Sequence, residues 1–152
     1  MLPVPRKYFV TAACAEGDTK LNAFDNALLA GRIGNVNLIR VSSILPPGAE
    51  YDPDLKLPLG ALVPTAYGAI ISNVPGELIA AAVGVGLSAD TFGVIMEFSG
   101  KCTREEAYSE IDRMLEEAFR QRKMELVEKK IAACEHRVVK VGCCIAAVPM
   151  WY

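Results

Sequence analysis

The spacing of apolar and polar residues divides the chain into several strands and two helices. The strand segments alternate apolar and polar residues or are continuously apolar, and they are rich in β-branched and aromatic side chains. We predict strands over Tyr8–Ala15, Val36–Val41, Ala61–Val74, Glu77–Leu87, Gly93–Ser99, Lys130–Arg137 and Val139–Trp151. The alanines of Glu77–Leu87 also suit a helix, but Gly84 and Gly86 favour a strand there.

Two other segments have the spacing of an amphipathic helix. The first is Leu21–Leu29, in which one apolar stripe is predicted to consist of Leu21, Phe24, Leu28 and Leu29. The second begins at Thr103, because Thr103 and Glu106 form a capping-box pattern that supplies partners to the free N–H groups of a helix start. Its apolar stripe is predicted to consist of Ala107, Ile111, Met114, Leu115 and Ala118.

The order of these elements predicts an α+β fold. The helices are far apart in the sequence and strands lie between and after them, which favours mainly antiparallel pairing. The segment Leu45–Leu59 contains four prolines and is predicted to be a loop, since proline donates no hydrogen bond to a sheet.

Composition and charge exclude several classes of protein. The chain has 152 residues, 52% hydrophobic and 22% charged, so we expect one well-packed domain spanning 1–152. The formal net charge of −2 lacks the basic excess of nucleic-acid-binding proteins. Leu57–Gly76, the longest uncharged run, contains three prolines and three glycines and does not suit a membrane span. No apolar signal segment is visible at the N-terminus, so we expect a cytoplasmic protein.

The cysteines give no sequence signature of a metal site. The chain has five: Cys14, Cys102, Cys134, Cys143 and Cys144. Their number is odd, no Cys-x-x-Cys pair occurs, and His136 is the only histidine. We therefore expect neither a zinc site nor a disulfide framework, but reduced and mostly buried thiols. Adjacent Cys143 and Cys144 are predicted to point to opposite faces of a strand.

A few polar residues are candidates for chemistry. The pair Ser42–Ser43 follows a predicted strand and precedes the proline-rich loop, where serines are also ordinary turn residues. Glu97 lies in an apolar run; in a central strand burial would raise its pKa and suit a proton donor, whereas at an edge it would face water. Asp25 lies in the first helix, and the Asn37 amide near the serine pair is able to polarise a carbonyl.

Four blocks of sequence together are more specific than any of these residues alone. LNAFDNALL, IGNVNLIRVSSILPPG, LGALVPTAYG and VIMEFSGKC occur in this order, and they resemble the pyruvoyl-dependent arginine decarboxylases. The resemblance extends from about Ala15 to the C-terminal AAVPMWY. It implies a four-layer αββα sandwich with mainly antiparallel sheets, assembled as a trimer with its sites between neighbouring subunits. The mean hydropathy of +0.26 is compatible with such an assembly.

The resemblance also implies that the chain cleaves itself. The Ser43 hydroxyl attacks the Ser42 carbonyl to give an ester, and Asn37 is the candidate that stabilises the oxyanion. β-Elimination releases the Ser42 carboxylate and leaves dehydroalanine; tautomerisation to an imine and hydrolysis by water, with loss of ammonia, then give a pyruvoyl group at position 43. The products are residues 1–42, the β chain, and residues 43–152, the α chain.

The implied reaction is the decarboxylation of arginine to agmatine, which feeds polyamine synthesis. The covalent pyruvoyl group takes the role of PLP, so neither PLP nor a metal is expected. It forms a Schiff base with the substrate, and Glu97 returns a proton after carbon dioxide leaves. Asp25 matches the family's partner for the guanidinium group, for which a carboxylate is well suited. Other positions that match the substrate pocket are Leu21, Leu28, Gly34 and Val36.

Three alternatives remain open from the sequence. The same scaffold could act on another amino acid such as aspartate, although Asp25 would repel an acidic side chain. The chain could be a structural or binding subunit that never cleaves, with Ser42–Ser43 as a turn. A hydrolase with Ser43 as a lasting nucleophile would require a base, and His136 is the only histidine.

Overall fold

The computed structural model describes residues 1–152 and contains two helices and ten strands. The helices are α1, Lys20–Ala30, and α2, Arg104–Arg122. The strands are β1 Lys7–Tyr8, β2 Thr11–Glu16, β3 Asn37–Arg40, β4 Ile44–Leu45, β5 Glu50–Tyr51, β6 Leu62–Ser72, β7 Leu78–Leu87, β8 Gly93–Gly100, β9 Glu128–Arg137 and β10 Gly142–Trp151. Neither helix combines the length and the apolar composition that crossing a bilayer requires.

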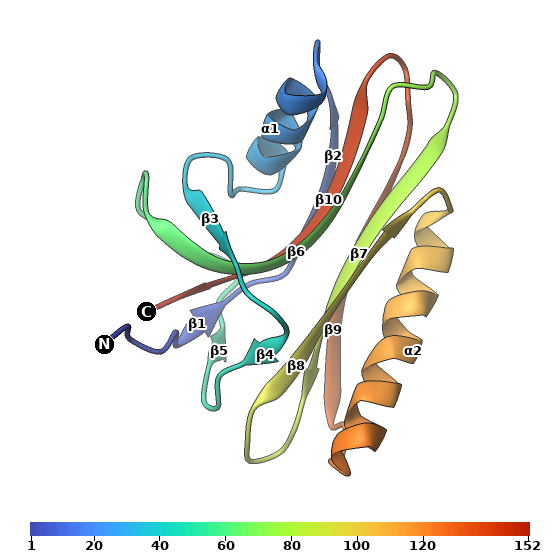
Figure 1. Cartoon of the computed structure of the whole chain (residues 1–152). Helices are drawn as coiled ribbons and strands as arrows, with labels where there is room; N and C mark the ends of the chain where they lie inside the picture. The colour runs from blue at the N-terminus through green and yellow to red at the C-terminus, as the bar shows by residue number, and fades with distance from the viewer.

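The strands form two sheets that face each other between the helices (Figure 1). The first sheet has the order β3-β6-β10-β1-β5, with β2 also paired to β10, and α1 covers its outer face. The second has the order β4-β8-β7-β9, and α2 covers its outer face. All pairs are antiparallel except β1–β5 and β3–β6, which are parallel. The predicted four-layer αββα sandwich is therefore confirmed.

Three layers of apolar side chains separate these four layers. On β10, Cys143 and Ile145 point outward to α1, whereas Cys144 and Ala146 point into the space between the sheets. Because both faces of β10 are buried, its residues are almost all apolar and do not alternate between apolar and polar. The prediction that Cys143 and Cys144 point to opposite faces is confirmed.

Helix α2 follows its sequence prediction closely. The Thr103 hydroxyl accepts a hydrogen bond from the Glu106 N–H at 3.1 Å and caps the first turn. The buried face contains four of the five predicted stripe residues, and Met114 is half-buried at its border. Two glycines of β7 let the helix lie close to the sheet, since a Cβ on Gly84 would come within 2.4 Å of the Ile111 side chain. Gly84 therefore both favours a strand in the sequence and allows α2 to pack closely on the sheet.

The apolar stripe predicted for α1 is wrong in part. The helix buries Ala23, Ala27 and Leu28 against the first sheet, while Leu21 is 75% and Leu29 46% exposed. Alanines at a spacing of four bring the helix backbone close to the sheet, so the buried face follows the small residues rather than the leucines. Two leucines are consequently left on the surface of the single chain.

The other differences concern strand ends. The predicted strand Tyr8–Ala15 is divided into β1 and β2, because β1 also pairs with β5 from within the predicted loop Leu45–Leu59. That segment is otherwise irregular apart from Leu45 at the end of β4, as its prolines require.

Candidate active site

The Ser42–Ser43 bond lies where the chain crosses from one sheet to the other. On one side of the bond, the Val41 N–H donates to the Thr65 carbonyl of β6 at 3.1 Å. On the other side, the Ser43 carbonyl accepts from the Ile95 N–H of β8 at 2.7 Å. Ser42 is exposed and Ser43 is half-buried, so the bond is held at both ends while one side is open to solvent.

The two sides of this bond are anchored independently. Before it, β3 pairs with β6, and the preceding segment contributes β1, β2 and α1 to the first sheet and its cover. After it, β4 pairs with β8 in the second sheet. A break between Ser42 and Ser43 therefore leaves both fragments attached to the sandwich by their own strand pairs.

Glu97 lies between the sheets beside this crossing. It belongs to β8, two residues from Ile95, and its side chain faces Gly68 of β6, where a Cβ would come within 3.4 Å of the Glu97 Cβ and Cγ. The β4–β8 register, continued by the Ser43 hydrogen bond, places Ser43 and Glu97 on the same inward face, about 7–8 Å apart between Cα atoms. Burial raises the pKa of Glu97 above its ordinary value, while Arg40 acts in the opposite direction.

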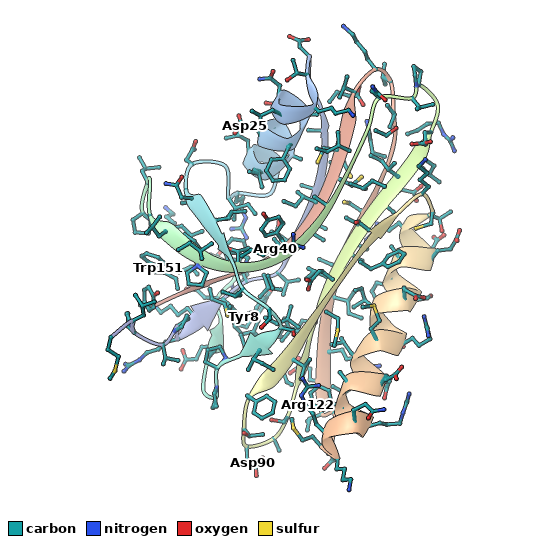
Figure 2. The ribbon with its side chains drawn as sticks, viewed as in Figure 1. Tyr8, Asp25, Arg40, Asp90, Arg122 and Trp151 are labelled. Carbon is teal, nitrogen blue, oxygen red and sulfur yellow. The ribbon has the colours of Figure 1, made fainter.

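Arg40 is a site residue that the sequence analysis missed. It ends β3, donates from Nη2 to the Tyr67 carbonyl at 2.7 Å, and its guanidinium lies 4.6 Å from the centre of the Tyr67 ring. Figure 2 shows Arg40 near the middle of the molecule, where the β3 segment passes over β6. The only sequence signal was a basic residue two positions before the serine pair. We refer to Arg40, Ser42, Ser43 and Glu97 as the serine crossing.

The remaining candidate residues form a second group, which we call the α1 face. It consists of Leu21, Asp25, Leu28, Gly34, Val36 and Asn37. Asp25 is exposed and forms no ion pair within the chain, and Leu21 beside it on the helix is exposed as well. Gly34 allows a close approach, since a Cβ there would lie 2.6 Å from the Leu29 Cδ2. Leu28 and Val36 belong to the apolar layer beneath α1.

Asn37 lies at the opposite end of β3 from the serines. Its Nδ2 donates to the Gly60 carbonyl at 3.0 Å. β3 carries the chain from Asn37 to Arg40 at about 3.3 Å per residue, so Asn37 lies roughly 10 Å from the Arg40 end of the strand, which leads to the serines. Within one chain, Asn37 therefore belongs to the α1 face.

One chain does not bring the α1 face and the serine crossing together. Asp25 lies on α1, outside the first sheet, whereas Glu97 lies inside it, against Gly68. Figure 2 shows Asp25 on the helix, away from Arg40. The first sheet therefore separates the predicted guanidinium partner from the predicted proton donor of the same chain.

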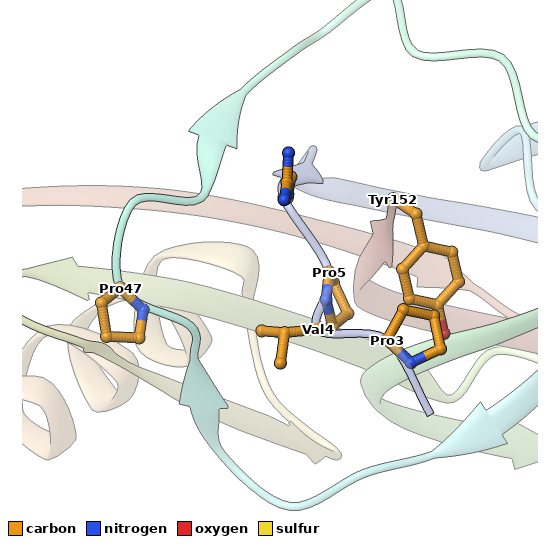
Figure 3. Close-up of a pocket in the computed structure, with 6 residues that line it drawn as sticks. Pro3, Val4, Pro5, Pro47 and Tyr152 are labelled. Atoms are coloured by element: carbon orange, nitrogen blue, oxygen red, sulfur yellow. The ribbon is translucent and has the colours of Figure 1, made fainter. Parts of the chain in front are cut away.

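Two hollows adjoin the N-terminal segment. One, of about 280 Å³, is lined by Ser42 among other residues: Leu2, Pro3, Pro5, Val41, Ile44, Pro46, Pro64, Met150 and Tyr152. The other, of about 610 Å³, is formed by Pro3, Val4, Pro5, Arg6, Pro47 and Tyr152 (Figure 3). Neither is lined by Glu97 or Asp25, so neither is by itself a complete pocket for an amino-acid substrate.

His136 has a partner of its own far from the serines. Its Nε2 is 2.6 Å from the Glu16 Oε2, and the Glu16 carboxylate also accepts hydrogen bonds from the backbone N–H groups of Val139, Lys140 and Val141. His136 belongs to β9, at the opposite edge of the second sheet from β4. It is therefore not placed to act as a base for Ser43.

Comparisons with known proteins identify the family of the chain. Residues 7–152 match the profile of the family described as pyruvoyl-dependent arginine decarboxylase (PvlArgDC). The pyruvoyl-dependent arginine decarboxylase of Methanocaldococcus jannaschii is 52% identical over 98% of this chain and 92% of its own length. Those of Thermococcus kodakarensis and Pyrococcus furiosus are 49% and 48% identical, each over 97% of this chain and 96% of its own length. The chain therefore belongs to the pyruvoyl-dependent arginine decarboxylase family, a family of carbon–carbon lyases.

Proposed function

We propose that this protein cleaves itself between Ser42 and Ser43 and then decarboxylates L-arginine to agmatine and carbon dioxide. The observation that carries this proposal is the serine crossing. A peptide bond held at both ends lies beside a half-buried carboxyl group, and each flanking segment keeps its own strand pairing. This arrangement suits a chain that must break without unfolding.

In the cleavage step, the Ser43 hydroxyl attacks the Ser42 carbonyl and the peptide bond is replaced by an ester. Elimination across Cα and Cβ of residue 43 requires a leaving group on Cβ, which serine supplies as the ester oxygen. The products are fragments of 42 and 110 residues. Asn37 lies at the end of β3 away from the serines and donates to the Gly60 carbonyl, so we assign the oxyanion role to Asn37 of a neighbouring subunit.

The residues at the crossing fit a covalent pyruvoyl group at position 43. Ser43 has the required β-oxygen, and its carbonyl accepts a hydrogen bond from the Ile95 N–H. Ser43 lies on the same inward face as Glu97, which packs against Gly68 between the sheets. The group supplies a ketone that condenses with the substrate amine and accepts the electrons released when carbon dioxide leaves. Glu97 is the proton donor to the former α-carbon of the substrate, and burial keeps its carboxyl protonated to higher pH than a solvated one.

Substrate recognition is assigned to the α1 face. A guanidinium group pairs well with a carboxylate, and Asp25 is exposed without a partner in the chain. Since the first sheet separates Asp25 from Glu97, a complete site requires Asp25 of one subunit and the serine crossing of another. The exposed Leu21 and Leu29 provide apolar surface for such a contact, in agreement with a trimer that has its sites between subunits.

Aspartate is the second candidate substrate, and it is disfavoured by the same residue. A substrate side chain with a carboxylate would meet the Asp25 carboxylate, and two like charges at close distance repel. A profile of initial rates with arginine, lysine, ornithine and aspartate separates the candidates. Arginine should be preferred, and Asp25→Ala should remove the preference while leaving the cleavage at Ser42–Ser43 intact.

The deciding experiment is the intact mass of the denatured protein, with and without reductive amination. The proposal predicts two chains that divide at Ser42–Ser43, with a carbonyl on the larger one that is modified by the amine and reductant. A Ser43→Ala variant is the matched control and should stay as one unmodified chain. A wild-type chain that stays intact after prolonged incubation at raised temperature would contradict self-cleavage and support a non-catalytic subunit.

A further inference from the structure

Three cysteines that are distant in sequence meet at one edge of the sandwich. Cys14 of β2, Cys134 of β9 and Cys144 of β10 place their sulfur atoms all within 4.8 Å of one another. Cys14 and Cys144 are direct partners in the β2–β10 ladder, with Sγ atoms 2.7 Å apart, while Cys134 approaches from the other sheet. We call these three residues the thiol cluster.

We propose that the thiol cluster is a binding site for one soft metal ion of filled d shell, such as Cu(I), Zn(II) or Cd(II), held by three thiolates. Three sulfurs arranged around an ion at about 2.3 Å each are separated by about 4 Å, which is within the span of the cluster. Cys14 and Cys144 must separate by about 1 Å, a change that small side-chain rotations provide. Binding releases the thiol protons to solvent and changes no oxidation state.

The side chains around the thiol cluster are apolar, so sulfur atoms are the metal ligands that it offers. Cys144 is buried and the other two are half-buried, and all three pack in the apolar layer between the sheets, beside residues such as Ile79, Ala81 and Ala132. No carboxylate or imidazole joins the three sulfurs in the cluster. Hard cations such as Mg²⁺ and Ca²⁺ require oxygen ligands, whereas thiolates select soft ions.

The thiol cluster lies where a metal ion in solvent can reach it. β9 is the edge strand of the second sheet, and β2 faces it from the first sheet with β10 as its only partner. Cys14 and Cys134 are therefore at the open seam between the sheets rather than at their centre.

This inference is independent of the proposed function. Cys134 lies on the strand β9, while Ser43 and Glu97 lie by β4 and β8 at the other edge of the same sheet. An ion at the thiol cluster would join β2 to β9 and thereby fix the two sheets relative to each other. The expected consequence is stability of the sandwich, with no part in the decarboxylation.

The test is a titration of the reduced, desalted, full-length protein with Cd(II), followed by thiolate-to-cadmium absorption in the ultraviolet. We expect one ion per chain and a raised Tm. Cys134→Ala, at a half-buried position, should weaken binding at least about tenfold, because one of three ligands is lost. Cys143→Ala and Cys102→Ala are matched controls that should bind as the wild type does, since neither sulfur belongs to the cluster.

A second measurement needs no variant. Alkylation of the wild-type protein, mapped by mass spectrometry, should show Cd(II) protecting the half-buried Cys14 and Cys134 but not Cys102. Absence of binding in a folded wild-type protein, or equal protection of Cys102, would overturn the proposal. So would a Cys14–Cys144 disulfide in protein purified without air, because it would consume two of the three ligands.

Discussion

At the serine crossing Ser43 and Glu97 are half-buried, whereas on the α1 face the only carboxylate, that of Asp25, is exposed and unpaired. Ser43 and Arg40 each form a hydrogen bond with a backbone group of a neighbouring strand. The absence of a side chain at Gly68 leaves space for the Glu97 side chain. In the single chain the Asp25 carboxylate forms no ion pair and is exposed to solvent. Under the proposed function, each chain supplies the scissile bond and the proton donor, whereas the Asp25 carboxylate must reach them from a neighbouring chain.

The largest expected effect comes from removing the reacting oxygen at the serine crossing. Ser43→Ala should abolish both self-cleavage and decarboxylation, because no β-oxygen remains to attack or to leave. Gel electrophoresis under denaturing conditions and an assay of carbon dioxide release measure the two effects. Cleavage in the Ser43→Ala chain would contradict the assigned site, and Ser99→Ala on β8 serves as a control that should still cleave.

The next effect separates chemistry from cleavage. Glu97→Gln keeps the size of the side chain but removes its acidic proton, so kcat should fall by about 10²–10⁴-fold, the usual contribution of a general acid. The processed fraction, measured by intact mass, should stay high. An unchanged kcat in processed Glu97→Gln protein would exclude Glu97 as the proton donor.

A change on the α1 face should affect recognition alone. Asp25→Asn replaces a charged partner of the guanidinium by a neutral one and should lower kcat/KM for arginine by about 10²-fold, mainly through KM. Cleavage at Ser42–Ser43 should be complete. If Asp25→Asn instead left kcat/KM unchanged, the pocket would have to lie elsewhere; Asn26→Ala, one position along α1, is the control.

Arg40 provides a finer test of the serine crossing. Its charge holds the raised pKa of Glu97 lower than burial alone would, so Arg40→Met should raise that pKa further. Because the protonated form of Glu97 is the active acid, the alkaline limb of the kcat–pH profile should move to higher pH. Movement to lower pH, or no movement, would show that another group controls this limb.

The smallest effect is expected outside both regions. Burial acts to raise the pKa of Glu16, but hydrogen bonds from His136 and the backbone of Lys140 and Val139 outweigh it and lower the pKa to about 2. The resulting stabilisation is present above the ordinary carboxyl pKa and is lost as the pH falls toward 2. Since Glu16 is partly exposed, Glu16→Gln should cost only about 1 kcal/mol, a few degrees in Tm, at neutral pH. Thermal unfolding at pH 7 and pH 2.5 measures the difference, which should become clearly smaller at the lower pH because part of the Glu16 carboxylate is then protonated in the folded protein; activity at pH 7 should not change.

Local patterns predicted the elements well, and their failures have physical causes. α2 was found because a capping box and an apolar stripe agree in one segment. The buried face of α1 was misjudged because Ala23 and Ala27, together with Leu28, contact the sheet, while Leu21 and Leu29 stay exposed. The family blocks made Ser43, Glu97 and Asp25 candidates for the site, but they did not show that a sheet lies between Glu97 and Asp25.

Contacts between distant segments were the part that the sequence did not reveal. Arg40 influences Glu97 only because β3 crosses toward the second sheet before β4 begins. The thiol cluster joins positions 14, 134 and 144, whose spacing resembles no metal motif. Such groupings depend on how the two sheets are stacked, and a pattern along the chain has no access to that stacking.

The crossing between the sheets also makes folding a one-way process for a chain that cleaves. Before the cut, a single polypeptide finds the sandwich, and its rate of folding does not depend on concentration. After the cut, residues 1–42 and 43–152 are held only by strand pairs and side-chain packing. Once such a protein is denatured, its two pieces must find each other in solution, so recovery becomes a second-order event and dilution alone is enough to make inactivation permanent.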